Sequence, residues 1–413
     1  MQHPSRAGLL RPGPDAHYLT DFLVRIYATA DDWVAQLAKR GAHRMRRRTF
    51  IRAATAAVGG FLTSGCDDAF PQSGGGRDGR PWVMPDEGQL HKRTWMAFAA
   101  SERIWDVELV PEVQRNLAAI AAVIARFEPV SMLVSPEEMG RAKSLIGSAN
   151  VELISADLDD LWIRDTGPVF VKSGSTTAGV DFNFNGWGNK QQHRADAKVA
   201  QLVSSHAGVE TLRTDLVLEG GALEVDGEGT AIITESCVLN NNRNPGWAKQ
   251  DVEAELDYLL GIKKVIWLPG IAGEDITDGH TDFYARFAGP GVVVAGLDAD
   301  PDSFDYDVTR RHLDILQKAT DVRGRPLQVE VIEGPSAVRE VFEDDDFAAG
   351  YINFYVCNSA VIGPEFGDAD ADRAAKSTLE RLFPGREVVQ ISIDGIAAGG
   401  GGIHCTTQQE PAG

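Results

Sequence analysis

Cysteine is scarce in this sequence, which has only four in 413 residues: Cys66, Cys237, Cys357 and Cys405. No two of them have the CxxC spacing of structural zinc sites. The sequence therefore predicts no zinc-stabilised module, and each thiol needs another explanation.

Positive charge is also in short supply. The chain has 40 Lys and Arg against 60 Asp and Glu, a formal net charge of -20. This balance disfavours nucleic acid and anionic membrane surfaces as partners, and it concentrates cationic ligands near the protein. With 43% hydrophobic residues, the composition is that of a globular protein with a substantial core.

Basic residues dominate only at the start of the chain, where residues 1–66 hold 10 Lys and Arg but 4 Asp and Glu. Residues 45–66 have the plan of a bacterial export signal, with "RRTFIR" similar to the twin-arginine motif. The apolar stretch from Ala53 to Leu62 is too short to span a bilayer. We expect export by the twin-arginine route; the alternative is a basic amphipathic helix on the folded protein.

The end of this segment, "TSGC", is similar to a lipoprotein cleavage site, which makes Cys66 a candidate for lipidation. The expected location is the periplasm, either free or anchored in the membrane as a lipoprotein, with no other contact to the membrane. Lipidation of Cys66 would leave an odd number of cysteines, so at least one thiol would stay free.

The rest of the chain divides simply. Because Met45 directly precedes the arginines, we expect residues 1–44 to be a non-native N-terminal extension. Residues 67–81 are acidic and rich in Gly, as a flexible tether would be. Residues 82–413 contain no linker and are expected to form one catalytic domain.

An internal repeat follows from five glycines, each placed between a helical pattern and a β-branched run: Gly147, Gly208, Gly261, Gly324 and Gly385. Their separations are 61, 53, 63 and 61 residues, which favours five α/β units around a common centre. A five-bladed α/β propeller would have this pattern, and ordinary βαβ alternation is the competing fold.

The repeat also relates three reactive side chains. Asp165, His280 and Cys405 lie 18, 19 and 20 residues after Gly147, Gly261 and Gly385. If the units are equivalent, matching loops bring these side chains together.

Cys405 follows four glycines in "GGGGIHC". Glycine allows positive φ and lets a flat substrate approach the main chain, which suits a nucleophilic thiol. The alternative is a turn followed by a small core residue.

His280 lies among three carboxylates, those of Asp275, Asp278 and Asp282. Carboxylates near an imidazole raise its pKa and orient it for proton transfer. They could instead hold a divalent metal ion, but no second His or Glu is suitably spaced, so we expect no metal.

Asp165 lies beside Trp162 and Arg164, just before a Gly-Pro turn. A carboxylate beside an aromatic face suits a planar cation, which takes two in-plane hydrogen bonds and a π surface. The alternative is a salt bridge of Arg164 and a turn capped by Asp165. Glu219 in "LEGGAL" and Asn358 after an apolar run are weaker candidates.

Five ordered motifs from "WIRDTGP" to "GGGGIHCTTQQEP" resemble the agmatine deiminase family, which is allied to bacterial peptidylarginine deiminases. The resemblance runs from Met84 to Pro411, with "LEGGAL", "DGHTDFYARF" and "NFYVCNSAVIGPEFGD" between the two ends. It implies a pseudo-fivefold α/β propeller with a central active site and hydrolysis of a guanidinium group without a cofactor. The chain departs from the family pattern at Gly88 and Gly402, and an export signal is unusual for it.

The resemblance implies roles for individual residues. Cys405 matches the nucleophile, His280 the general acid and base, and Asp165 and Asp282 the carboxylates that grip the guanidinium. The expected substrate contacts are completed by these residues: Trp162, Glu219, Asp278, Asn358 and Gly402.

The expected reaction converts agmatine and water to N-carbamoylputrescine and ammonia through a covalent thiouronium on Cys405. Three alternatives stay open: an exported peptidylarginine deiminase, an amidinotransferase and a non-catalytic guanidine-binding lipoprotein. The sequence also leaves a homo-oligomer open.

Overall fold

The computed structural model describes residues 79–342 and 347–413. The predicted extension, export signal and lipidation site at Cys66, and all of the tether except its last three residues, lie outside these ranges. None of the helices in the described ranges has the length and apolarity needed to cross a membrane.

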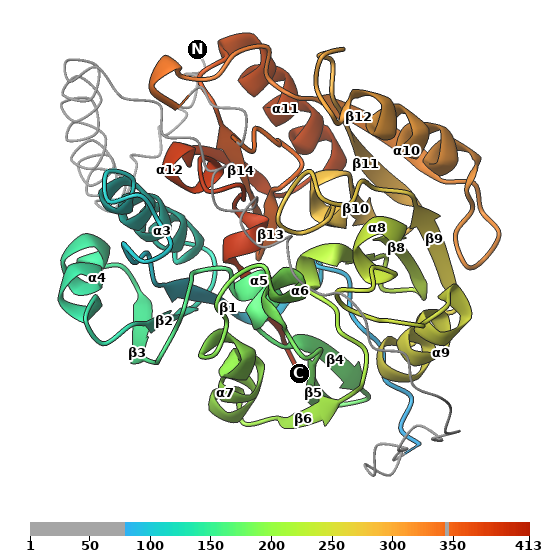
Figure 1. Ribbon diagram of the computed structural model, residues 1–413, viewed down its shortest axis with the longest axis horizontal. Coiled ribbons are helices and arrows are strands. Elements are labelled where there is room, and N and C mark those ends of the chain that lie inside the picture. The colour runs from blue at the N-terminus through green and yellow to red at the C-terminus, as the bar shows by residue number, and fades with distance from the viewer. Residues whose placement is uncertain (1–78, 343–346) are drawn as a thin grey trace, which may run out of the picture. The chain divides into compact units, whose positions relative to one another are not determined.

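The described residues form five separate sheets, as shown in Figure 1. The first has the strand order β16-β1-β2-β3 and the other four have three strands each. The strands of the first sheet are β1 (His91–Phe98), β2 (Val130–Val134), β3 (Val151–Ser155) and β16 (Gln408–Pro411). The other sheets are, in turn, β4 (Val169–Ser173), β5 (Thr176–Asp181), β6 (Glu210–Arg213); β7 (Leu223–Val225), β8 (Thr230–Thr234), β9 (Lys264–Leu268); β10 (Ala285–Gly289), β11 (Val292–Leu297), β12 (Gln328–Glu333); and β13 (Tyr355–Cys357), β14 (Ala360–Glu365), β15 (Glu387–Ser392).

Every sheet repeats one pattern. A strand pairs antiparallel with the second strand, and the second pairs parallel with the third, as in β4, β5 and β6. In the first sheet this pattern is β16, β1 and β2, so the last strand of the chain pairs with the first. The predicted repeat of five α/β units is therefore present in the described residues.

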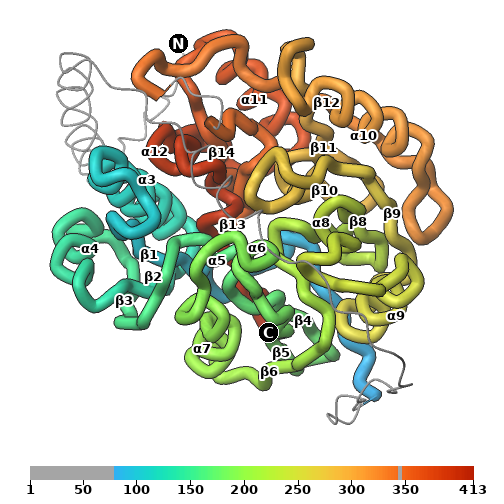
Figure 2. Tube along the Cα trace, in the orientation of Figure 1, coloured from blue at the N-terminus to red at the C-terminus, as the bar shows by residue number. Residues whose placement is uncertain are grey.

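A long helix joins the two parallel strands of each unit, because parallel strands need a crossover connection. These helices are α3 (Val110–Ile124), α7 (Val199–Ala207), α9 (Lys249–Leu260), α10 (Tyr306–Lys318) and α11 (Ala369–Leu382). In Figure 1 they lie toward the periphery of the view, and the tube in Figure 2 passes from sheet to sheet in chain order. The remaining helical segments are α4 (Met139–Ile146), α5 (Ile163–Thr166), α6 (Gly186–Asn189), α8 (Glu235–Val238), α12 (Asp394–Ala397), η1 (Asp196–Lys198), η2 (Gly220–Ala222), η3 (Thr281–Phe283), η4 (Glu340–Phe342) and η5 (His404–Thr406).

The prediction that each of the five glycines lies between a helix and a strand was correct in detail for only some of them. Gly208 and Gly261 end α7 and α9 in the left-handed conformation, as predicted. Gly324 and Gly385 instead lie in the turns that follow α10 and α11, and Pro384 prevents α11 from continuing. Gly147 ends α4, which leads to β3, an additional strand beyond the repeated pattern.

Four short helical turns precede the antiparallel strands β4, β7, β10 and β16. These turns are α5, η2, η3 and η5, and they carry most of the residues predicted to react. The loop around Asn353 occupies the equivalent place before β13. The repeat thus gives five equivalent segments from which side chains can meet.

Candidate active site

The structure brings together the four side chains that the sequence predicted to react. The Sγ of Cys405 lies 3.6 Å from Oδ2 of Asp282, and Nδ1 of His280 lies 3.8 Å from Oδ1 of Asp165. All four residues have at most 7% of their surface exposed.

Gly221 marks the point where three of these side chains meet. A Cβ atom there would lie 2.6 Å from Nδ1 of His280, 2.9 Å from Oδ1 of Asp165 and 3.2 Å from Oδ2 of Asp282. The second glycine of "LEGGAL" therefore lets the imidazole and the two carboxylates approach the backbone closely.

Cys405 lies in η5 and is surrounded by acceptors rather than cations. Burial raises the pKa of its thiol well above the usual range, and the carboxylates of Asp282 and Asp165 raise it further. The thiol is therefore protonated at neutral pH when no ligand is bound. A cation between the two carboxylates would reverse this effect and favour the thiolate.

The asparagine beside Cys405 is Asn353, not Asn358. Asn353 donates from Nδ2 to Sγ of Cys405 at 3.4 Å, and its Oδ1 accepts from the backbone N–H of His404 at 3.0 Å. Asn358 bonds both backbone groups of His91 at 2.9 Å. The prediction for Asn358 was wrong because that residue follows strand β13, whereas the site lies at the strand's beginning.

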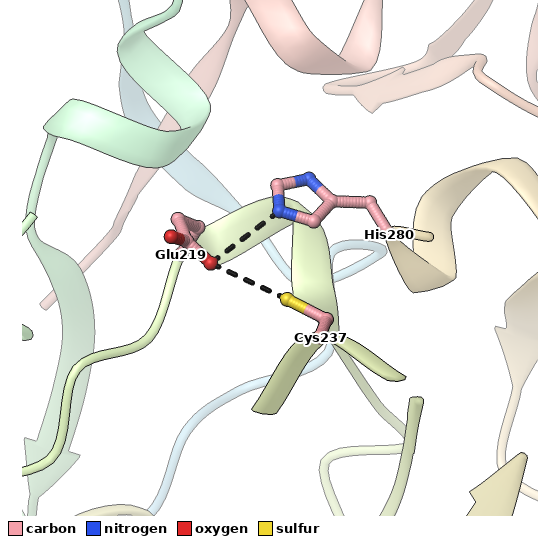
Figure 3. Close-up of side chains that lie close together, drawn as sticks. All are labelled: Glu219, Cys237 and His280. Atoms are coloured by element: carbon pink, nitrogen blue, oxygen red, sulfur yellow. Dashed lines mark hydrogen bonds and ion pairs between the residues drawn. The ribbon is translucent and has the colours of Figure 1, made fainter. Parts of the chain in front are cut away.

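His280 is held between two carboxylates. Burial would lower the pKa of its imidazole, but Asp165 on one side, and Cys237 and Glu219 on the other, raise it well above its usual value. Nε2 of His280 lies 3.5 Å from Oε2 of Glu219, as shown in Figure 3. The ring is therefore positively charged at neutral pH and can donate a proton.

Glu219 supports His280 from behind. Its carboxylate is fully buried and accepts from Nε of Arg243 at 2.8 and 3.0 Å. Burial would raise the pKa of Glu219, but Arg243 and His280 outweigh it, so the net shift is downward.

Asp278 was predicted to contact the substrate. The structure shows instead that it pairs with Arg243, the residue that holds Glu219. It pairs with Nη1 of Arg243 and Nζ of Lys190, both at 2.7 Å, and accepts from Asn242 at 3.0 Å. Both carboxylate oxygens are thus already bonded to protein groups. The prediction for Asp278 rested on its place two residues before His280 in the sequence. In an irregular loop, side chains of near neighbours can point in different directions.

Asp165 is anchored by groups from elsewhere in the chain. Gly221 donates its N–H to Oδ1, and Trp187 donates its Nε1–H to Oδ2, both at 3.0 Å. Burial raises the pKa of Asp165. Sequence reasoning missed Trp187, whose only signal was an aromatic residue between two glycines in "NGWGN".

Two of the glycines of residues 399–402 pack against tryptophan rings, one of which is that of Trp162. Trp162 stacks on Trp105 with ring centroids 5.9 Å apart. A Cβ atom on Gly401 would lie 2.1 Å from the ring of Trp162, and one on Gly399 would lie 2.0 Å from the ring of Trp105. The glycines therefore admit two indole rings.

Gly402 makes room for a protein side chain in the same way. A Cβ atom there would lie 2.3 Å from Oδ1 of Asn353, so the glycine lets Asn353 reach the backbone of Cys405. Gly400 is the residue of the run with positive φ. Gly88, the other departure from the family pattern, lies in a turn before β1 and donates its N–H to Asp86 at 2.9 Å.

Sequence reasoning also missed Glu87 in "MPDE". Its carboxylate contacts Nε2 of His404 at 2.9 Å, while Nδ1 of the same ring contacts Oδ2 of Asp282 at 2.7 Å. Arg164 and Arg286 also donate to Glu87, at 3.0 and 2.9 Å, which is the salt bridge that the sequence left open for Arg164. His404 therefore orients Asp282, whose Oδ1 is buried without a hydrogen bond.

One group of side chains could hold a metal ion among the described residues: Glu219, Cys237 and His280. Their candidate ligand atoms all lie within 4.8 Å of one another.

The chain matches known proteins along nearly all of the described region. Residues 83–411 match the model of the Porphyromonas-type peptidyl-arginine deiminase family. A Streptomyces coelicolor protein, provisionally named an agmatine deiminase, is 42% identical over 337 residues, 79% of this chain and 98% of that protein. The agmatine deiminase of Pseudomonas aeruginosa is 36% identical over 352 residues, 80% of this chain and 95% of that protein.

A solved structure agrees with these matches. The structure of the agmatine deiminase of Enterococcus faecalis superposes with a TM-score of 0.76 at 32% identity, over 80% of this chain and 96% of that one.

Proposed function

We propose that this chain, which belongs to the agmatine deiminase family, hydrolyses the guanidinium group of agmatine to give N-carbamoylputrescine and ammonia. The observation that carries this proposal is a buried thiol next to two buried carboxylates, with an imidazolium within reach. We further propose that the five units form a pseudo-fivefold propeller, which the pairing of β16 with β1 supports.

The two carboxylates serve to bind the substrate. A guanidinium between Asp165 and Asp282 replaces a repulsive pair with two charge-assisted interactions. Oδ1 of Asp282 has no hydrogen-bond partner among the described residues and is free to accept from the guanidinium.

Binding also activates the nucleophile. The positive charge of the guanidinium offsets the carboxylates that hold the pKa of Cys405 high, so the thiol loses its proton more easily in the complex. Fixing the guanidinium between two carboxylates also localises its charge and makes its carbon a better electrophile.

The reaction then proceeds in two steps. The Cys405 thiolate attacks the guanidinium carbon, and His280 donates a proton to the departing nitrogen, which leaves as ammonia. Water attacks the covalent thiouronium that remains and gives one proton to His280. The C–S bond then breaks, the neutral ureido product leaves, and the second proton returns to the Cys405 sulfur, which restores the thiol.

A peptidylarginine deiminase is the second candidate, and the name of the matching family model favours it. Both activities need the same chemistry at the guanidinium. They differ in whether the remainder of the substrate is a short alkylamine or a peptide main chain.

One incubation separates the candidates. The full chain is mixed with agmatine, free arginine or a peptidylarginine, and ammonia and the mass of the ureido product are measured. We expect product from agmatine, none from a Cys405→Ala variant, and unchanged turnover from Cys357→Ala, which removes a buried thiol in β13. Product from the peptide alone would replace the first proposal with the second, and binding without ammonia would indicate a non-catalytic binding protein.

The export signal is a separate proposal, supported by the sequence of residues 45–66. We propose that the chain leaves the cytoplasm by the twin-arginine route and is lipidated at Cys66. Replacing Arg47 and Arg48 with Lys should keep the protein in the cytoplasm, and Cys66→Ser should release it from the membrane fraction.

A further inference from the structure

Cys237 is a second thiol close to the reacting groups, and the proposed reaction does not use it. It lies in α8, just after β8, whereas Glu219 precedes η2 and His280 precedes η3. Figure 3 shows the three side chains directed toward one another from these separate segments. Cys237 and Glu219 are fully buried and His280 is 3% exposed.

The spacing of the three side chains fits a metal ion. Sγ of Cys237 and Nε2 of His280 each lie 3.5 Å from Oε2 of Glu219. Around a tetrahedral Zn²⁺, with bonds of about 2.3 Å to sulfur and about 2.0–2.1 Å to nitrogen and oxygen, neighbouring ligand atoms are roughly 3.3–3.6 Å apart. Both pairs that include Oε2 of Glu219 already have this spacing, and the third pair, Sγ of Cys237 and Nε2 of His280, lies within 4.8 Å.

An independent observation points to a ligand at this place. Nε2 of His280 is buried and makes no hydrogen bond to a described residue, because its contact with Oε2 of Glu219, at 3.5 Å, is an ion pair only. Buried ring nitrogens normally have a partner. A metal ion would supply one.

The surroundings also favour an ion here. Arg243 donates to both oxygens of Glu219 and fixes the orientation of the carboxylate, as the outer partners of metal ligands do. Asp278 at 2.7 Å offsets the charge of Arg243.

We propose that Glu219, Cys237 and His280 form an inhibitory binding site for a thiophilic divalent cation such as Zn²⁺. The inhibition rests on the proposed function, whereas the binding does not. As the ion binds, the Cys237 thiol releases its proton to solvent and forms a metal–sulfur bond, and no group is oxidised or reduced. Nε2 of His280 releases its proton to solvent and gives its lone pair to the ion, so the imidazolium becomes a neutral ligand.

Inhibition follows from the loss of the imidazole. With Nε2 bound to the ion, His280 carries a hydrogen on Nδ1 toward Asp165 and can no longer take up a proton from water. The site lies beside the nucleophile without using it, since the sulfur that binds the ion is that of Cys237.

The binding test uses the full chain and Cd²⁺, whose bonds to thiolates absorb in the near ultraviolet. We expect one equivalent of Cd²⁺ to produce this band in the wild type, in Cys357→Ser and in Cys405→Ser, and the band to vanish in Cys237→Ser. Persistence of the band in Cys237→Ser, its loss in Cys405→Ser, or its absence from the wild type would overturn the site. X-ray absorption of the zinc-loaded wild type tests the same point without a variant: one sulfur ligand with nitrogen or oxygen ligands is expected, and no sulfur would refute it.

The inhibition test measures ammonia release from agmatine. Zn²⁺ should inhibit the wild type and Cys357→Ser, a chelator should restore both, and Cys237→Ser should need at least tenfold more Zn²⁺. Equal sensitivity of Cys237→Ser would contradict the inhibition. If agmatine is not a substrate, the Cd²⁺ band still decides the binding site, so the two proposals fail separately.

Discussion

At the scale of single residues, the site has two buried carboxylates, those of Asp165 and Asp282, next to the Cys405 thiol. A bound cation would neutralise their effect on the thiol. Asp165 and Asp282 both pack against Gly221, and both raise the pKa of the Cys405 thiol. His280 is kept protonated by Asp165 and Glu219. The resting state therefore holds a protonated thiol and a proton donor, and a guanidinium ion supplies the charge that activates the nucleophile.

Asn353 and Asn358 form a matched pair for testing the surroundings of the nucleophile. Asn353→Ala removes the contact with Sγ of Cys405 and leaves the backbone N–H of His404 without its side-chain acceptor. Losing a buried hydrogen bond costs about 1–3 kcal/mol, so we expect kcat/KM for agmatine to fall roughly 5- to 150-fold. Asn358→Ala should leave kinetics unchanged and lower the unfolding free energy; equal kinetic effects would contradict the assignment to Asn353.

Gly221 is expected to be intolerant of any side chain. The Cβ of Gly221→Ala would come within 2.6 Å of Nδ1 of His280, so it would displace the imidazole and enter the space proposed for the guanidinium. A displacement of about 1 Å in a catalytic group costs roughly 100-fold in rate, which is the loss we expect in kcat/KM. Gly140→Ala, in α4 with no heavy atom within 4 Å of the new Cβ, is the control and should keep wild-type kinetics. Wild-type activity in Gly221→Ala would show that this space is not the substrate site.

The sequence predicted the four side chains that the structure brings together, but it did not predict most of the residues that hold them in place. These four residues lie in short sequence motifs, and their side-chain types indicate a nucleophile, a proton donor and two cation-binding carboxylates: Cys405, His280, Asp165 and Asp282. Asn353, Trp187 and Glu87 act through contacts between segments far apart in the chain. Such contacts depend on which side of a turn faces inward, and local sequence does not determine that.

At the scale of secondary structure elements, the site depends on short turns between regular units. The turns α5, η2, η3 and η5 each end where an antiparallel strand begins, so strand pairing fixes their position. The sequence predicted helix-to-strand alternation because glycines and β-branched runs are local signals. The sequence analysis counted the helix α4 and the strand β3 as one of the five units. They show the same helix–glycine–strand pattern as the units do, although β3 is an additional strand of the first sheet.

His312 on α10 makes the free energy of unfolding depend on pH. Its Nε2 accepts from the backbone N–H of Gly270 at 3.0 Å, which requires the neutral ring. Burial lowers its pKa from 6.5 to about 3, and Arg311 acts in the same direction. The folded state therefore binds fewer protons than the unfolded state between these values, so this contribution is complete above pH 6.5 and is lost as the pH falls toward 3.

We expect His312→Gln, which can still accept from Gly270, to lose less stability on acidification than the wild type does. The difference between pH 7 and pH 5 should be about 2 kcal/mol. Urea unfolding at both pH values measures it, with His206→Gln on the exposed surface of α7 as the control. The same loss in the wild type and in His312→Gln would remove His312 as the cause.

At the scale of the whole described molecule, the sheets are connected by strand pairing and by buried charges. β16 pairs with β1, so the nucleophile lies just before the strand that joins the two ends of the catalytic domain. Arg286 on β10 donates to Glu224 of β7, to Glu87 before β1 and to the carbonyl of Phe354 before β13. One buried cation thus connects four segments around the site.

Arg286→Met should therefore destabilise the fold strongly. Removing one partner of a buried ion pair costs about 3–5 kcal/mol, because the opposite charge stays buried. Arg381→Met removes an ion pair to Glu330 from a side chain that is 55% exposed, and should change the unfolding free energy by less than about 1 kcal/mol. Urea unfolding of both variants measures the difference, and similar values would show that the buried network contributes little.

The most direct test of the central claim is to trap the covalent intermediate. The enzyme is mixed with agmatine, quenched in acid during turnover and digested, and the peptide carrying Cys405 is weighed. The account predicts a substrate-derived adduct on Cys405, absent from Cys405→Ser, together with ammonia release before the ureido product appears. Turnover of agmatine by Cys405→Ser, or an adduct on Cys237 instead, would contradict it.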